Sequence, residues 1–175
     1  MVAGGGSLLL VADHYPFGPA ASSLANAFGV TMHGGFAEVP KAYRGRQDSG
    51  SIDFSRTNRL LADSPIANGR GASERITEVL SFTGQSLDAP GAIALLDLPP
   101  TAIEAVPPPP VFKDQPAGKS QGVALPYGRG RVVVLGEAGM LTAQVSEGQK
   151  FGMNIPGIDN RQFVLNTMHW LTGLF

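Results

Sequence analysis

The residues best suited to chemistry follow two apolar segments of the chain. Asp13 and His14 come directly after residues 7–12, and Glu137 comes shortly after residues 132–135. If these segments are neighbouring parallel strands, the three side chains share the rim of a sheet, where open α/β sheets bind ligands. A histidine beside a carboxylate can act as a general base. Two carboxylates and an imidazole can also divide acid and base roles or bind a divalent ion.

Each of these three residues also has a structural interpretation. Asp13 can cap the helix that follows it, and His14 can hydrogen-bond a loop. Glu137 can cap a short helix over residues 138–144. The residue types alone leave both interpretations open.

A second polar group lies near the end of another predicted strand. Ser81, Thr83, Gln85 and Ser86 offer hydroxyl and amide groups that could bind a substrate. One of the serines could be a nucleophile if His14 approaches it. The chain contains no Gly-x-Ser-x-Gly elbow, which is the usual setting of such a serine, so this signal is weak.

Three further features have simpler explanations. Arg70, between two glycines, could clamp a carboxylate or phosphate, but a surface ion pair is the better explanation. Residues 118–120 read Gly-Lys-Ser, yet the glycine required upstream for a phosphate-binding loop is replaced by Lys113. His33 and His169 stand outside any metal-binding motif and are interpreted as structural.

Composition bounds the functions that remain. Hydrophobic residues make up 43% of the 175 residues and charged residues 15%, which is typical of a folded chain with one core. The absence of cysteine excludes thiolate nucleophiles, disulfides and sulfur-ligated metals. A net charge of −1 gives no basic surface for nucleic acid. The first apolar run is too short to span a membrane and lacks a basic leader, so we expect a cytoplasmic chain without membrane contact, unless it is part of a longer protein.

Strands and helices are expected to alternate along the chain. Residues 7–12 form a continuous apolar run, which is typical of a strand in the middle of a parallel sheet. A helix is predicted over residues 20–28, with Pro19 near its start and Gly29 just past its end. Further strands are predicted at residues 76–82, 92–96, 123–125 and 132–135, the last two forming a hairpin, and a closing helix begins at Asp159 or Asn160.

Two segments interrupt this alternation. Residues 34–72 show little periodicity and are predicted to be a long irregular excursion. Residues 98–120 are predicted to be a proline-rich connection, with 106–111 in a polyproline II conformation. The remaining pattern predicts a single α/β domain over residues 1–175, a three-layer sandwich around a mixed, mainly parallel sheet.

Three stretches of the chain resemble a known superfamily. Residues 4–14, 130–138 and 163–171 are similar to the C-terminal part of uncharacterised members of the class I glutamine amidotransferase-like superfamily. This resemblance implies a flavodoxin-like fold whose first strand–helix units are missing here. It also implies a catalytic site at the turn after residues 7–12. The family places a cysteine at that turn, whereas this chain has Asp13 and His14, so cysteine-dependent glutamine hydrolysis is excluded.

Two functions follow as hypotheses. The first is a small hydrolase, acting on ester or related acyl bonds of a small-molecule substrate, with His14 as base, Asp13 as its orienting partner and Glu137 assisting. No cofactor is required, although a divalent metal stays open. The second is a non-catalytic domain that binds a ligand or a protein. Under both hypotheses we expect a homodimer, because the missing leading strand would leave a sheet edge uncovered.

Overall fold

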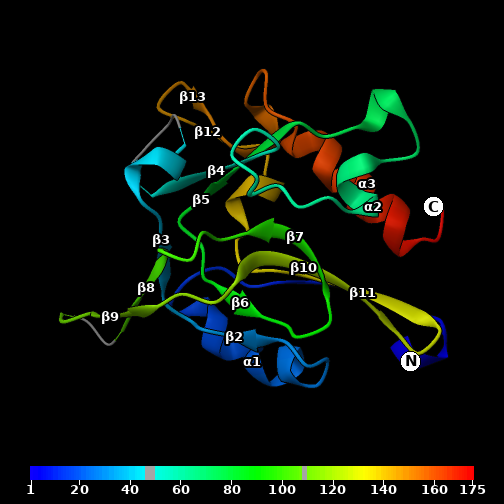
Figure 1. Ribbon diagram of the computed structural model, residues 1–175, viewed down its shortest axis with the longest axis horizontal. Helices are drawn as coiled ribbons and strands as arrows, with labels where there is room; N and C mark the ends of the chain where they lie inside the picture. The colour runs from blue at the N-terminus through cyan, green and yellow to red at the C-terminus, as the bar shows by residue number, and fades with distance from the viewer. Residues whose placement is uncertain (46–49, 108–109) are drawn as a thin grey trace.

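A computed structural model describes residues 1–45, 50–107 and 110–175, and it is built mainly from β-strands (Figure 1). The main sheet has the strand order β1-β11-β10-β6-β2, and β7 also pairs with β10. Its strands are β1 (Ser7–Val11), β2 (Thr31–Met32), β6 (Leu87–Asp88), β7 (Ile93–Asp97), β10 (Ser120–Tyr127) and β11 (Gly130–Leu135). The sheet curls into a half-barrel.

Three small sheets, three α-helices and five short 3-10 helices complete the described part of the chain. The small sheets join β3 (Phe36–Glu38), β8 (Ile103–Val106) and β9 (Lys113–Pro116); β4 (Ser51–Ser55) and β5 (Glu78–Phe82); and β12 (Val145–Ser146) and β13 (Gln149–Lys150). The α-helices are α1 (Phe17–Asn26), α2 (Pro65–Asn68) and α3 (Asn160–Leu171). No helix among the described residues is long and apolar enough to cross a membrane.

The predicted flavodoxin-like, three-layer sandwich with a mainly parallel sheet is wrong. Among the described strands only β1 and β11 pair in parallel, and every other strand pairing is antiparallel. A parallel sheet needs a long crossover, usually a helix, between successive strands. The hairpins β10–β11 and β12–β13 are antiparallel because a short turn reverses the chain, whereas β3–β8, β2–β6 and the pairs of β10 with β6 and β7 join strands that are distant in the sequence. There is consequently no parallel array from which leading strand–helix units could be missing.

The first strand is also placed differently from the prediction. The apolar run of β1 was expected at the centre of the sheet, but β1 is the last strand at one edge. None of its five residues is fully buried. Partial cover on both faces explains its apolar character, because Leu8 and Leu10 pack on one core cluster while Leu9 and Val11 pack on the other.

The other predicted strands and both predicted helices are confirmed, with ends that differ by a few residues. The β10–β11 hairpin turns at Gly128, whose φ of 61° favours glycine. Asp159 is the N-cap residue of α3, but its carboxylate Oδ2 accepts hydrogen bonds from the Thr77 amide and hydroxyl instead of capping the helix. Asn160, the first helical residue, exchanges two hydrogen bonds with the backbone of Leu80 and so fixes α3 to β5.

The segments expected to be irregular contain regular elements. Residues 34–72 include β3, β4 and α2, and residues 98–120 include β8 and β9. The prediction of polyproline II structure over residues 106–111 includes 108–109, which lie outside the described residues.

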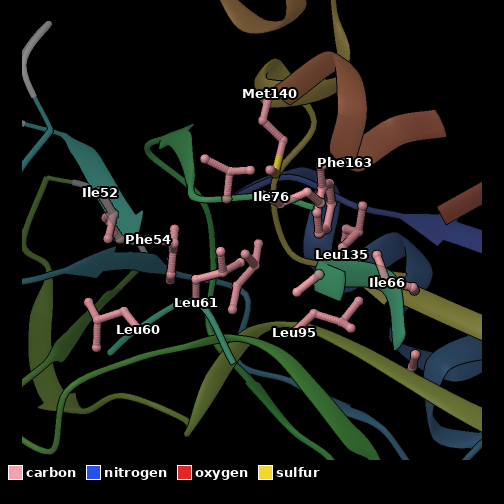
Figure 2. Close-up of a cluster of buried hydrophobic side chains, with 14 of the residues drawn as sticks. Ile52, Phe54, Leu60, Leu61, Ile66, Ile76, Leu95, Leu135, Met140 and Phe163 are labelled. Carbon is pink, nitrogen blue, oxygen red and sulfur yellow. The ribbon is translucent and has the colours of Figure 1, made fainter. Parts of the chain in front are cut away.

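Two hydrophobic clusters lie on opposite faces of the main sheet. Alternate side chains of β11 pack into each cluster. Val132 and Val134 pack with α1, while Val133 and Leu135 pack toward α2 and α3. Figure 1 shows α1 on one side of the sheet and the other two helices on the opposite side. Figure 2 shows the larger cluster, where side chains of β4, β7, β11, α2, α3 and the 3-10 helix Gly139–Leu141 meet. Among them are Ile52, Phe54, Ile66, Leu95, Leu135, Met140 and Phe163.

Candidate functional site

The parallel pair β1–β11 brings the two predicted acidic residues to the same end of the sheet. Val11 pairs with Leu135, and the Ala12 amide donates to the Leu135 carbonyl at 3.1 Å. Asp13 and Glu137 follow at equivalent positions beyond the two strands. The Asp13 carboxylate therefore raises the electrostatic cost of ionising Glu137.

Glu137 is buried, and its carboxylate caps the backbone amides that follow it. Its Oε2 accepts a hydrogen bond from the Met140 amide at 2.8 Å, and its Oε1 accepts one from the Gly139 amide. Burial raises the pKa of Glu137 to about 8, and the nearby Asp13 carboxylate contributes in the same direction. These contacts match the capping interpretation, since Gly139–Leu141 is a short 3-10 helix.

His14 is oriented by a backbone carbonyl. Its Nδ1 lies 2.7 Å from the Tyr15 carbonyl oxygen, so Nδ1 is the donor, and in the neutral form of the ring the lone pair is on Nε2. Nε2 is 3.8 Å from Asp13 Oδ1, which already accepts the His14 backbone amide at 2.8 Å. Burial raises the pKa of Asp13. The orienting contact expected from Asp13 is thus made by the Tyr15 carbonyl, and the imidazole stacks on Phe36 with ring centroids 4.5 Å apart.

Gln85 fastens this turn to the rest of the protein. Its Nε2 donates to the carbonyls of Ala12 at 2.8 Å and Asp13 at 2.9 Å, and its Oε1 accepts the Gly34 amide at 2.8 Å. The side chain is fully buried. Gly18 of α1 lies against it, and a Cβ at that position would come within 2.5 Å of the Gln85 amide. Both polar atoms of the Gln85 side chain are therefore hydrogen-bonded to backbone groups.

The other predicted substrate-binding residues are separated. Ser86 is buried, and its Oγ accepts the Gly118 amide at 2.7 Å. Ser81 is buried, and its Oγ has no hydrogen-bond partner among the described residues. Thr83, with a φ of 20°, lines the groove described below. Arg70 forms an exposed ion pair with Glu74, which lowers the Glu74 pKa to about 2.

The two isolated histidines have local partners. His33 Nε2 lies 2.9 Å from Asp88 Oδ2, and His169 lies within α3 with its ring against Phe175. Within the described residues, no group of three histidine and acidic side chains is placed to hold a metal ion.

A groove that the sequence did not indicate adjoins the His14 turn. It encloses about 730 Å³ between the β3-β8-β9 sheet and the end of β5. Its lining includes Phe36 and Phe112, whose rings meet edge to face at 5.6 Å, and the charged residues Glu38, Arg44 and Asp114. Residues 36 and 112 are joined only through the pairing of β3 with β8 and of β8 with β9. No spacing along the chain could have revealed this aromatic pair.

Glu104 is a second residue that sequence inspection missed. It is fully buried on β8, where its two carboxylate oxygens accept the amides of Gly35 and Ser86 at 2.9 and 3.0 Å. Its burial raises its pKa. These bonds hold the loop that enters β3, so Glu104 supports one side of the groove. Glu104 is a single acidic residue among apolar ones, and nothing in that local pattern indicates a buried carboxylate that binds loop amides.

Comparison with known proteins identifies a similar fold. No protein-family model and no curated protein matches the chain. Among solved structures, it is similar to the mmIFT52 N-terminal domain, with a TM-score of 0.60 and 13% sequence identity. The match covers 96% of this chain and 66% of that chain, so the chain spans about two thirds of its length.

The predicted resemblance to the glutamine amidotransferase-like superfamily is therefore wrong. The fold is mostly β with a mixed sheet, similar to that of the mmIFT52 N-terminal domain, and the described residues form no flavodoxin-like arrangement. The segments that carried the resemblance are an apolar strand, a strand ending in glycine and an amphipathic helix. Such segments occur in many folds, because burial alone selects their residue types.

Proposed function

We propose that this chain is a non-catalytic domain that binds a small, mainly apolar molecule in the groove beside Phe36 and Phe112. The observation that carries the proposal is the aromatic pair in a groove of about 730 Å³, a volume within the usual range of ligand sites. Apolar walls with a few charged groups are typical of such sites, because the walls supply affinity and the charges supply orientation.

The hydrogen bonds of the buried acidic residues favour a binding function over a catalytic one. Both oxygens of Glu137 and both oxygens of Glu104 accept backbone amides. The Ser86 hydroxyl and the Gln85 amide are engaged in the same way. Groups used to hold loops in place are poorly placed to exchange protons with a substrate.

The lining also indicates the chemistry of the ligand. A flat aromatic or aliphatic body can lie on Phe36 and Phe112, and an anionic group can pair with Arg44. The dye anilinonaphthalene sulfonate combines these features and reports binding by its fluorescence. It is therefore the probe we would use first.

Phe112→Ala is expected to weaken binding of this dye by about tenfold, roughly 1.4 kcal/mol, because one wall of the groove is lost. Folding stability should stay close to that of the wild type, since Phe112 is 40% exposed. Titration of the dye with thermal unfolding in parallel measures both quantities. Val111→Ala is the matched control, because the neighbouring Val111 is exposed and outside the groove lining. Equal dye affinity in the wild type and both variants would contradict the proposal.

A hydrolase is the second candidate, and one observation favours it. Asp13 and Glu137 both have raised pKa values at one end of the sheet, and the lone pair on His14 Nε2 is available as a base. Ionisable groups perturbed in this way cluster at active sites. A depression of about 480 Å³ adjoins Asp13.

If His14 is a general base, His14→Ala should lower turnover of a chromogenic ester by on the order of a hundredfold or more. His33→Ala is the control, because His33 is paired with Asp88 away from this turn. A panel of acyl, phosphoryl and glycosyl esters, with and without divalent ions, measures the effect. Absence of turnover in the wild type and both variants would leave binding as the function. The expected homodimer and cytoplasmic location also remain proposals, and the dimer is developed below.

A further inference from the structure

The outer edge of β1 is open and carries no charge. Two bonds to β11 establish which backbone groups face inward: the Arg131 amide donates to the Gly6 carbonyl at 3.2 Å, and the Ala12 amide donates to Leu135. Because backbone groups alternate along a strand, the N–H and C=O groups of Ser7, Leu9 and Val11 point away from β11. No described strand pairs with that side.

This edge lacks the features that usually prevent strands from pairing between molecules. Natural edge strands carry lysine, proline or a bulge, or are covered by another element. β1 has the sequence Ser-Leu-Leu-Leu-Val, pairs with β11 in regular register, and has no fully buried residue. An edge of this kind is suited to pairing with a further strand.

Helix α1 extends the apolar surface beside this edge. It contains no charged residue, and Phe17, Ala20, Ala21 and Leu24 recur at the spacing of one helix face. Phe17 and Leu24 are 59% and 47% exposed. The depression of about 480 Å³ is lined by Val11 and Ala12 together with Phe17, Ala20 and Ala21, so β1 and α1 share one surface.

We propose that this surface binds a second copy of the chain, with the two β1 strands pairing antiparallel about a two-fold axis at Leu9. In this register the outward groups of Leu9 bond to those of Leu9 in the other copy, and Ser7 bonds to Val11 on both sides. All three outward-facing residues of each strand are then paired, and Leu8 faces Leu10 across the axis. The two main sheets become one continuous sheet.

Self-complementarity is what favours a second copy over another partner. A two-fold interface brings the same surface together, so any charge at its centre would meet its own copy. β1 and α1 carry none. The apolar residues Leu8, Leu9 and Leu10 are also symmetric about Leu9, so the strand matches itself when reversed.

Single cysteines test the register, because the natural chain has none. Directly opposed residues of such a pair have Cα atoms about 5.5 Å apart, within the range of about 4.4–6.8 Å that a disulfide spans. Leu9→Cys should therefore form a disulfide-linked dimer on mild oxidation. Ser7→Cys should not, since the two Ser7 residues would lie about 14 Å apart. The double variant Ser7→Cys/Val11→Cys should link again.

Sedimentation of the wild type at high micromolar concentration should show a dimer. Leu24→Arg should weaken it by about tenfold or more, whereas Val145→Arg, at an exposed site on the β12–β13 hairpin, should not. Leu24 is exposed, so this pair of variants tests the surface even if a substitution in β1 impairs folding. A monomeric wild type, or equal linking of Leu9→Cys and Ser7→Cys, would overturn the proposal. Neither result depends on ligand binding in the groove.

Discussion

Replacing Glu137 with glutamine is expected to remove most of the decline in folding stability between about pH 5 and about pH 8. The pKa of Glu137 is about 8 in the folded protein, against an ordinary value of 4.5. Between these values the folded state keeps a proton that the unfolded state releases. Rising pH therefore favours unfolding, by up to about 1.4 kcal/mol per pH unit.

The sign of this effect distinguishes Glu137 from an ordinary carboxylate. Its stabilising contribution is complete below pH 4.5 and is lost as the pH rises through about 8. Asp13, Asp97 and Glu104, whose pKa values are also raised, add slopes of the same sign. Glutamine cannot ionise, so Glu137→Gln should retain only the part of the pH dependence that comes from other residues.

Urea denaturation at a series of pH values measures the slope. The free energy of unfolding at low pH should be somewhat smaller in Glu137→Gln. The side-chain nitrogen of glutamine cannot accept a hydrogen bond, so the backbone N–H of either Met140 or Gly139 loses its acceptor. Glu147→Gln, at an exposed position next to β13, is the control and should leave the slope unchanged. Parallel pH profiles in the wild type and Glu137→Gln would show that Glu137 is ionised when buried.

The second large effect is expected from Gln85→Ala, which should lower the free energy of unfolding by about 3 kcal/mol. The substitution leaves the Gly34 amide and the carbonyls of Ala12 and Asp13 without their partner in the protein interior. It also leaves a cavity against Gly18. Urea denaturation measures the loss, and Gln115→Ala on the exposed strand β9 should cost less than about 0.5 kcal/mol.

Gln85→Glu separates hydrogen bonding from packing. It preserves the side-chain volume and the acceptor for Gly34, but it removes the amide donors to Ala12 and Asp13. At neutral pH it should therefore destabilise the protein nearly as much as alanine does. A glutamate variant as stable as the wild type would mean that Gln85 acts through its shape alone.

The amino-acid sequence by itself determined the local elements and one feature of the site. Hydrophobic runs and turn residues located β1, β5, β7, the β10–β11 hairpin, α1 and α3, because these patterns depend on neighbouring residues. The proximity of Asp13 and Glu137 was predictable on the condition that their strands are parallel neighbours, which they are.

Tertiary structure alone decided how the strands are arranged and where the groove lies. An apolar run such as residues 7–11 indicates that both faces of a strand are covered. It does not specify which strands lie beside it, because backbone hydrogen bonds are nearly independent of residue type. It was therefore consistent with the centre of a sheet, although β1 lies at the edge. For the same reason Phe36 and Phe112 meet only because β8 pairs with both β3 and β9, a long-range pairing that no local pattern encodes.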